Sequence, residues 1–416
     1  MQFLNNDVLR EIFLKLADTN DLTGECSSIG LSDLYPCISV CRQWCNVAIP
    51  ILWGRPFHSL RFSEEEPIPR TSDKILEMYF RFLSNEDKQN LLNKGIDISL
   101  VTPVNQQKIY SYVDENEEEE SCEKENDFNN FDDNDDNTIT QKEPWFVYPS
   151  FLKSLSYINL CLAVIEWCGD LENIMKQKYG EDSELTEEAE YLILHTILKL
   201  CFNKGARLFS LNILIYDFIF SDNDKDDKKT LALTKCFVDE ELKGFFASIH
   251  SLEFNVMFKV TNGLISMLSQ ICHKLNHIYV HKLWSRHPDT QIVTEFGESF
   301  TSLVSAQKNL SSFYLSECKG YTHVFLPALS QCTKSLRHMK FEEVDFKDCR
   351  PWFTIAECAN LVSLQVIQCS NTNFEMIEPV INTTFTNISE VLYYGDGICN
   401  EFTEWADGIN NKIRQI

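Results

Sequence analysis

Three cysteines at a regular spacing are the first candidates for chemistry in this sequence. A helix would bring Cys37, Cys41 and Cys45 to one face, where their thiolates could bind zinc or form a redox centre. Zinc sites of this kind normally need a second pair of cysteines or histidines at a matching spacing, and none follows. Small apolar packing is therefore the favoured interpretation of these side chains.

Three histidines share the same spacing and raise the possibility of a metal site. They are His273, His277 and His281. The alternation of apolar residues from Leu275 to Val280 predicts a strand, and a strand would separate His273 from the other two. We therefore predict that these histidines do not bind a metal together.

Sequence motifs for catalysis are absent from the chain. It contains no nucleophile elbow, no glycine-rich phosphate loop, no HExxH helix and no paired CxxC. We therefore predict that the protein is not an enzyme and has neither a cofactor nor a metal.

Charge and composition indicate a protein partner. The chain of 416 residues has a formal net charge of −25, which would repel nucleic-acid backbones and anionic membrane surfaces. Hydrophobic residues make up 44% of the sequence, which is enough for a packed core. The length favours two or more domains.

Cysteine usage and hydropathy predict a soluble protein of the cytoplasm and/or the nucleus. The 16 cysteines are spread along a chain that opens without a signal peptide, so we interpret them as reduced thiols. No stretch approaches the roughly 20 uninterrupted apolar residues of a membrane-spanning helix. The best candidate, 208–220, is interrupted by Asn212 and Asp217.

The elements that would position functional residues begin with a capped helix near the N-terminus. Asn5, Asn6 and Asp7 are helix-capping residue types, and apolar residues follow them at helical spacing. The apolar face consists of Val8, Leu9, Ile12, Phe13 and Leu16. This face needs a covering partner.

Further helix patterns follow along the chain. One apolar stripe starts at Leu34 and is expected to stop at Pro50, with 51–53 closing a small helical unit. Two shorter helix patterns lie within 72–94, with Ser84 as the cap between them.

Two acidic segments predict loops without stable structure. The segment 113–143 consists mainly of Asp, Glu and Asn, so burial cannot offset the entropy of ordering it, and we predict a disordered insertion. The shorter run 221–229 is predicted to be another mobile loop.

The rest of the chain, from about residue 149, repeats a short apolar pattern of the form L-x-x-L-x-L. Its eight copies are Leu155-Ile158-Leu160, Leu208-Leu211-Ile213, Ile249-Leu252-Phe254, Leu275-Ile278-Val280, Leu310-Phe313-Leu315, Leu336-Met339-Phe341, Leu361-Leu364-Val366 and Ile388-Val391-Tyr393. The last three intervals are about 26 residues long, and the earlier ones hold extra helix and loop. Helical spacing between the copies predicts units of one strand and one helix.

Polar residues between the buried positions of each strand should line one common surface. The candidates for binding a target there are His277, Tyr279, His281, Tyr314, His338, Lys340 and Gln365. Tyrosine is enriched at binding hot spots, and cationic side chains stand out on an acidic chain. The alternative is an ordinary solvated strand face, since polar and buried residues alternate in any one-sided sheet.

Two N-terminal segments resemble the F-box family. They are LNNDVLREIFLKL at 4–16 and DLYPCISVCRQWCNVAIPILW at 33–53. The resemblance rests on the leucine-rich first helix, the V-C-R-x-W element at 40–44 and the closing Leu-Trp at 52–53. Two features depart from the family: Asn5 stands where proline is usual, and the loop 18–33 is longer.

The repeated pattern is similar to that of leucine-rich repeats. The two resemblances together imply an α/β repeat fold, with an N-terminal three-helix F-box followed by an irregular leucine-rich-repeat solenoid. The implied parts are an F-box at 1–57, a helical linker at 58–112, the acidic insertion at 113–143 and the leucine-rich-repeat domain at 149–416.

This layout implies the substrate-recognition subunit of a Skp–cullin–F-box ubiquitin ligase. Its implied partners are a Skp-type adaptor, a cullin bound through that adaptor, and a target protein. The adaptor-binding residues by analogy are Leu4, Val8, Leu9, Ile12, Phe13, Leu16, Ile51, Leu52 and Trp53. Two alternatives stay open: these residues form only the core of a small helical domain, or the F-box-like helices only cap a leucine-rich-repeat scaffold.

Overall fold

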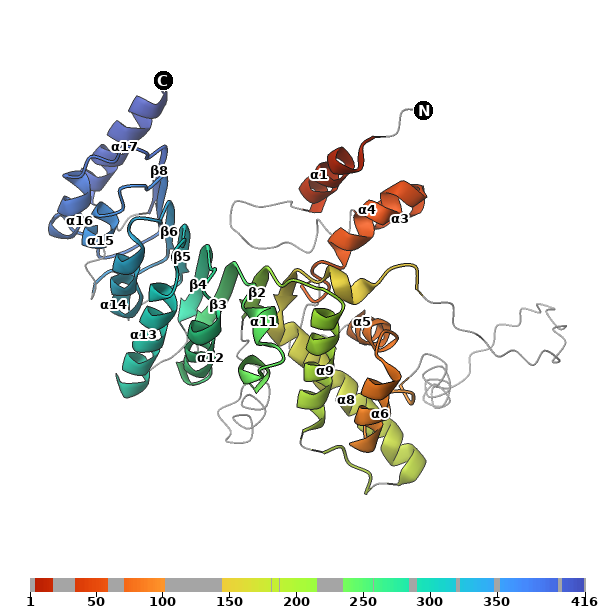
Figure 1. Ribbon diagram of the computed structural model, residues 1–416. Helices are drawn as coiled ribbons and strands as arrows, with labels where there is room; N and C mark the ends of the chain where they lie inside the picture. Colours follow the sequence, from red (N-terminus) through yellow and green to blue (C-terminus); the bar gives the residue numbers. More distant parts are fainter. Residues whose placement is uncertain are drawn as a thin grey trace, which may run out of the picture.

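The computed structural model shows a mixed α/β protein in which strands form one side of an arc and helices the other (Figure 1). It describes residues 4–17, 34–58, 71–101, 144–180, 182–186, 188–214, 235–256, 258–283, 290–318, 322–347, 352–395 and 399–414. The loop 18–33, the insertion 113–143 and the run 221–229 lie outside the described residues. Within these residues, no helix has both the length and the apolar character needed to cross a membrane.

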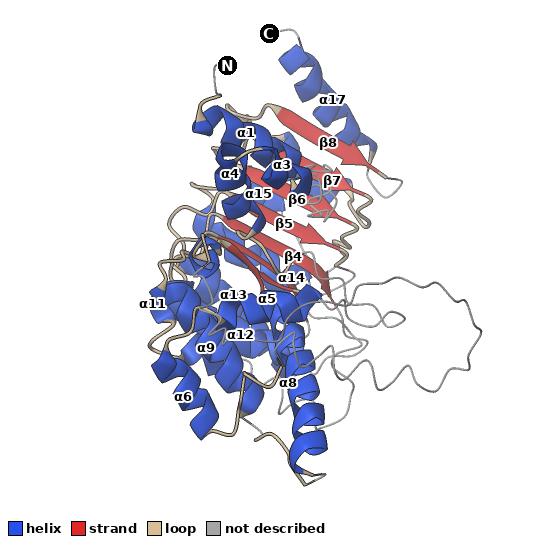
Figure 2. Ribbon diagram, turned by 90° about the vertical axis from the view of Figure 1, so that its right-hand side faces the viewer, coloured by secondary structure: helices blue, strands red, loops and turns tan. Residues whose placement is uncertain are grey.

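A parallel sheet runs through the described part of the chain from residue 154 onward. Its eight strands are hydrogen-bonded in sequence order, so each unit pairs with the unit before it and the unit after it. The strands are β1 (Ser154–Ser156), β2 (Ser210–Ile213), β3 (Ser251–Val256), β4 (His277–Leu283), β5 (Ser312–Ser316), β6 (His338–Glu342), β7 (Ser363–Ile367) and β8 (Glu390–Tyr394). Figure 2 shows β4 to β8 following one another along the arc.

Strand pairing places equivalent residues of the repeated pattern side by side. Leu211, Leu252 and Ile278 are partners in successive strands, and the same row continues through Phe313 and Met339. Each of these five side chains is at most 1% exposed. The strands predicted for the second to eighth copies of the pattern are therefore confirmed.

The first predicted copy, Leu155-Ile158-Leu160, is wrong. β1 is only three residues long, and its Leu155 pairs with Leu211, which is the second position of the next copy. Ile158 and Leu160 lie in a helix that begins at Tyr157. The first eight residues of this helix, 157–164, are all buried, so the apolar run reflects a helix that is covered on every side at its start.

Helices connect the later strands and cover the outer side of the sheet (Figure 1). They are α12 (Phe258–Ile271), α13 (Thr290–Ser305), α14 (Thr322–Phe325), the 3-10 helix η3 (Leu326–Cys332), α15 (Trp352–Ala356) and α16 (Phe374–Ile381). Phe300 of α13 joins the two layers. Its ring centroid lies 6.4 Å from that of Phe313 in β5 and 5.2 Å from that of Phe325 in α14.

A left-handed residue follows each of the last four strands. Glu317, Glu343 and Gln368 have φ values of 49°, 53° and 50°, and Gly395 after β8 has a φ of 128°. A Cβ atom on Gly395 would lie 2.8 Å from the Cα atom of Gln368, so this position requires glycine. A positive φ therefore recurs at the end of each of these strands.

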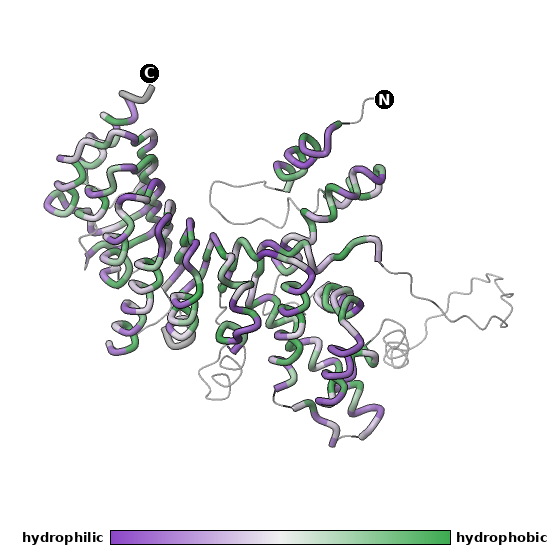
Figure 3. Tube along the Cα trace, viewed as in Figure 1, coloured by the Kyte–Doolittle hydropathy of each residue, from purple (hydrophilic) through white to green (hydrophobic). Residues whose placement is uncertain are grey.

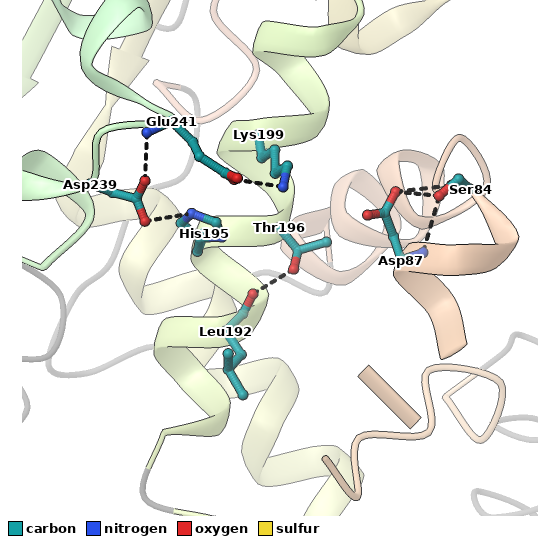
Figure 4. A network of polar contacts seen from close by, with 8 residues as sticks. All are labelled: Ser84, Asp87, Leu192, His195, Thr196, Lys199, Asp239 and Glu241. Carbon is teal, nitrogen blue, oxygen red and sulfur yellow. Dashed lines mark hydrogen bonds and ion pairs between the residues drawn. The ribbon is translucent and has the colours of Figure 1, made fainter. Parts of the chain in front are cut away.

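The irregular part of the chain before β3 is mainly helical. Its elements are α5 (Thr71–Phe80), α6 (Asn85–Asn93), the 3-10 helix η2 (Tyr148–Phe151), α8 (Tyr157–Tyr179), α9 (Ala189–Asn203) and α11 (Lys243–Phe246). Trp167 of α8 is fully buried and packs edge-on against Phe80 of α5, with centroids 5.0 Å apart. The two helices predicted within 72–94 are confirmed, and Ser84 caps the second by accepting from the amide of Asp87 at 3.0 Å (Figure 4).

The N-terminal helical unit consists of α1 (Asn6–Ala17), α3 (Tyr35–Val40) and α4 (Arg42–Leu52). Two predictions about it are wrong. The second apolar stripe is not continuous, because Cys41 is extended with φ −166° and ψ 167°. The helix does not stop at Pro50, which lies in the last turn of α4, where its missing amide removes only one helical hydrogen bond.

The break at Cys41 also decides the arrangement of the three cysteines. Cys37 is buried in α3, Cys41 is exposed between the two helices, and Cys45 is partly exposed in α4. They therefore do not share one helix face.

Aromatic packing and backbone hydrogen bonds attach the N-terminal helical unit to the rest of the fold. The ring of Trp53 lies 4.4 Å from that of Tyr148 and 5.9 Å from that of Tyr79, between centroids. The amide of Lys153 donates to the carbonyl of Gly54 at 2.9 Å. These contacts connect the end of α4 directly to the start of β1.

Helix α17 (Asn400–Arg414) covers the last strand of the sheet. Asn410 Oδ1 accepts from the amide of Val391 at 3.1 Å, and Asn410 Nδ2 donates to the carbonyl of Val391 at 2.7 Å. One side chain thus satisfies both backbone groups of a residue in an edge strand.

We predict that Asn410→Ala lowers the free energy of unfolding by about 1–3 kcal/mol, because two backbone groups of β8 lose their partners. Urea unfolding measures this loss. Asn411→Ala is the matched control, since Asn411 is exposed on the same helix. Equal stability of the two variants would contradict the role of Asn410 at this edge.

Candidate functional site

The inner face of the sheet is formed by two rows of residues that point away from the buried core. The first row is Ser154, Ser210, Ser251, His277, Ser312, His338, Ser363 and Glu390, and the second is Ser156, Asn212, Glu253, Tyr279, Tyr314, Lys340, Gln365 and Leu392. Every target-binding candidate except His281 lies in these rows, and His281 follows Tyr279 by one further alternation in β4. The predicted common face is therefore confirmed, and its role in binding stays a prediction.

A chain of polar contacts crosses three strands of the inner face. Glu253 Oε1 lies 2.9 Å from His281 Nε2, and Glu253 Oε2 accepts from Asn212 Nδ2 at 2.7 Å. The other ring nitrogen, His281 Nδ1, lies 3.0 Å from Ser316 Oγ. Both ring nitrogens of His281 are therefore held, which fixes the orientation of the ring.

These contacts decide the charge of Glu253. Burial alone would raise the pKa of this carboxyl, but the hydrogen bonds from His281 and Asn212 lower it below its usual value. The inner face therefore has an anchored negative charge near its middle at neutral pH.

A second cluster lies beside the first, around Tyr314. The Tyr314 hydroxyl donates to Glu342 Oε2, and Lys340 Nζ lies 2.9 Å from the same oxygen. Lys340 Nζ also lies 4.7 Å from the centroid of the Tyr314 ring, within cation–π distance. Burial, with the hydrogen bond to Glu342, raises the pKa of Tyr314, so the phenol stays protonated and remains a donor.

The remaining candidates extend this surface on both sides. Gln365 Nε2 donates to Glu390 Oε2 at 3.3 Å. The ring of His277 stacks near that of Tyr279, with centroids 6.4 Å apart. Burial, together with the neighbouring His338 and His250, lowers the pKa of His277, so this ring is neutral at pH 7.

The Glu253, His281 and Ser316 side chains have the composition of a hydrolytic triad, but the surroundings do not fit acyl transfer. Ser316 is only 5% exposed. The amide of Glu317, which would be the nearest oxyanion donor, donates instead to the carbonyl of Glu342 at 2.8 Å. The arrangement is suited to holding a patterned polar surface for recognition.

His58 lies at the N-terminal end of the inner face. Its Nε2 atom is 3.1 Å from Ser154 Oγ in β1. Burial, aided by the positive charge of Arg55, lowers the pKa of His58 to about 4, although Glu253 acts in the opposite direction. The side chain is therefore neutral in the folded protein above this pH.

We predict that His58 makes stability depend on pH. The unfolded chain takes up this proton near pH 6.5 and the folded chain only near pH 4, so stability falls as pH drops through that window. In His58→Gln, which can still bond Ser154, the loss of unfolding free energy between pH 7 and pH 5 should be smaller by about 1–2 kcal/mol. Urea unfolding at both pH values tests this, and an unchanged pH dependence would contradict it.

A cluster on the helical side contains side chains of metal-ligating types. Potential ligand atoms of His195, Asp239 and Glu241 lie within 4.8 Å of one another, the one such group among the described residues. His195 Nε2 lies 2.9 Å from Asp239 Oδ2, and Lys199 Nζ lies 2.6 Å from Glu241 Oε2 (Figure 4). The lysine already neutralises Glu241, which does not favour a metal ion here. The two ion pairs instead hold α9 against the turn before α11.

The second candidate surface is an exposed apolar row on α1. Leu4, Val8, Ile12 and Leu16 are spaced four residues apart, on one side of the helix and the residues before it, and their exposed fractions are 48%, 48%, 43% and 38%. Figure 3 shows hydrophobic and hydrophilic residues alternating along this helix. The described part of the chain leaves this row uncovered.

Three of the predicted adaptor-binding residues are buried within the chain. Leu9 and Phe13 are each 1% exposed, and Ile51 is 9% exposed, because they form the core between α1 and α4. The Phe13 ring packs edge-on against Trp44, with centroids 5.2 Å apart. They stabilise the N-terminal helical unit and have little surface for a partner.

The two remaining adaptor candidates lie at the end of α4. Leu52 is partly buried against the same small core, and Trp53 packs against the neighbouring helical region. Their main contacts are within the chain, so the exposed row on α1 is the better candidate for a partner.

Several residues of the inner face were not among the sequence candidates. Asn212 and Glu253 occupy the same position of the repeated pattern as Tyr279, so the spacing alone could have included them. His58 gave no such signal, because it lies before the repeats and reaches the face only through the fold.

Comparisons with protein-family models, with curated proteins and with solved structures found no match.

Proposed function

We propose that this chain is the substrate-recognition subunit of a Skp–cullin–F-box ubiquitin ligase, with an N-terminal F-box and a leucine-rich-repeat arc. The exposed apolar row on α1 binds a Skp-type adaptor, which connects the chain to a cullin. The inner face binds a target protein. The resemblance of 4–16 and 33–53 to F-box sequences supports the choice of adaptor.

The observation that carries the proposal is the division of the apolar residues of α1 between two faces. Leu9 and Phe13 are enough to pack the helix onto α4, as their burial indicates. The second set, which includes Val8 and Ile12, stabilises nothing within the described chain. An amphipathic helix that lays anchors at such spacing into an apolar groove is a common mode of protein recognition.

The mechanism is positioning. In this proposal the other subunits carry out ubiquitin transfer, and the chain holds a target near a charged carrier enzyme, which raises the effective concentration of the target lysine. This role requires the adaptor and the target to bind different surfaces, as α1 and the inner face allow. It also places the chain in the cytoplasm and/or the nucleus.

The alternative is a scaffold whose helices only cap the repeat array. A terminal cap normally presents a polar outer face, because it separates the apolar stack from water. The outer side of α1 instead carries three exposed apolar side chains, those of Val8, Ile12 and Leu16, and the exposed Leu4 precedes them. This difference favours a protein-binding role for the helix.

Affinity purification of the intact chain followed by mass spectrometry tests the proposal. We expect a Skp-type adaptor and a cullin to be enriched with the chain. Enrichment of other proteins without any adaptor would support the scaffold instead.

A further inference from the structure

A cleft of about 760 Å³ lies between the N-terminal helical unit and the first strands of the inner face. Residues of α1 and α4 line one side, and residues at the starts of β1 to β4 line the other. Its volume falls within the range of roughly 300–1,000 Å³ that is common for small-ligand sites. The cleft shares the first-row residues of β1 to β4 and Tyr279 with the inner face, but its three cationic residues belong to neither the proposed target surface nor the proposed adaptor surface.

The charges that line the cleft differ from those of the whole chain. The chain has 37 Lys and Arg residues against 62 Asp and Glu residues. In the cleft, however, Arg10, Arg55 and Lys153 are accompanied by a single carboxylate, that of Asp7. No ion-pair partner of Arg10 or Lys153 is found among the described residues, so both charges are available to an anion.

The floor of the cleft adds hydrogen-bonding groups. Ser210 and Ser251 are adjacent in the first row of the inner face, and their hydroxyls have no partner within the described part of the chain. The buried Nδ1 atom of His277, next in the same row, also has no hydrogen-bond partner there. Buried polar atoms normally have partners, which suggests that a ligand or water completes this floor.

An aromatic ring lines the same cleft. Phe209 is 51% exposed, and its ring is held by stacking on His250, with centroids 4.9 Å apart and an interplanar angle of 11°. An exposed and supported ring of this kind is a platform on which a flat ligand ring can stack. Cations and an aromatic platform therefore occur in one cleft.

We propose that this cleft binds a ligand of the nucleotide class, a phosphate ester joined to a flat ring. The phosphate lies against Arg10, Arg55 and Lys153, and the ring lies against Phe209. Ser210 and Ser251 donate hydrogen bonds to the ligand. This inference does not depend on the proposed adaptor, because the isolated chain contains the whole cleft.

Isothermal titration of the intact chain with AMP, adenosine and ribose 5-phosphate tests the assignment. We expect AMP to bind, with adenosine and ribose 5-phosphate each at least about tenfold weaker. The double variant Arg10→Glu, Lys153→Glu should weaken AMP binding by at least about tenfold. The double variant Lys274→Glu, Lys334→Glu has the same net charge, changes exposed lysines outside the cleft, and should bind AMP as the wild type does.

Phe209→Ala tests the contact with the ligand ring separately from the contact with its phosphate. It should weaken the binding of AMP and leave that of ribose 5-phosphate unchanged. The proposal is overturned if AMP does not bind, if the two double variants lose affinity equally, or if ribose 5-phosphate binds as tightly as AMP. Circular dichroism of each variant confirms that it is folded before titration.

Discussion

Replacing Val8, Ile12 and Leu16 by aspartate will abolish adaptor binding while the chain stays folded. These side chains are exposed, so the substitutions place charge in water in the free protein and cost little stability. In a complex the same charges would enter an apolar groove without partners, which costs on the order of 2–5 kcal/mol. We expect the dissociation constant for a Skp-type adaptor to rise at least about 100-fold.

A matched control distinguishes loss of this surface from a general effect of added charge. Val238, Phe353 and Phe374 are also exposed apolar residues, and they lie outside the N-terminal helical unit. Aspartate at these three positions adds the same charge and should leave adaptor binding unchanged. Adaptor binding at wild-type strength by the Val8, Ile12, Leu16 variant would show that α1 is not the docking helix.

Alanine at Tyr279, Lys340 and Gln365 is expected to release the target while the adaptor remains bound. These three residues belong to the second row of the inner face, and each is partly exposed. Lys340 and Gln365 are neighbours in this row, and Tyr314 lies between Tyr279 and Lys340. Hot-spot residues at protein interfaces commonly contribute 2 kcal/mol or more, so we expect target affinity to fall at least about 30-fold. Tyr314 is left in place because it is buried and holds Glu342.

Quantitative proteomics of ubiquitinated proteins measures this effect. Proteins whose modification depends on the wild-type chain should lose it with the triple alanine variant, although the adaptor still co-purifies. Lys308→Ala, a change at an exposed lysine outside the inner face, is the control. Unchanged modification in the triple variant would move the target site away from the second row.

The regular part of the fold could be predicted because spacing alone determines it. In β3 to β7, apolar residues alternate with more polar ones over at least four residues, and parallel pairing keeps equivalent positions adjacent. The first copy failed because β1 has only three residues, too few to show alternation. The apolar residues after it belong to α8, and a short apolar run does not distinguish a strand from a buried helix.

The apolar residues of α1 were predicted from the sequence, but their division into a buried set and an exposed set was not. Leu9 and Phe13 fall within the same helical stripe as Val8 and Ile12, so periodicity places all of them on one side. Their separation depends on where α4 crosses the helix, with Trp44 against Phe13. A sequence pattern that describes one helix does not contain that crossing.

The cleft and the polar network of the inner face depend on contacts between distant segments. Gly54 and Lys153 are joined by a backbone hydrogen bond, which brings α4 and α1 beside the starts of the strands. Glu253 and His281 meet because β3 and β4 are neighbours in a defined register. Once the register of the strands is known, the residues of each row follow from the sequence. The sequence does not show that Arg10 and Phe209 line the same cleft.

Titration of the purified intact chain with a purified Skp-type adaptor is the decisive test of adaptor binding. The proposed function predicts a one-to-one complex with a dissociation constant below about 1 µM. It also predicts that the Val8, Ile12, Leu16 aspartate variant gives no measurable binding under the same conditions. Absence of binding by the wild-type chain at adaptor concentrations of about 50 µM would contradict the assignment of this protein as an adaptor-bound receptor.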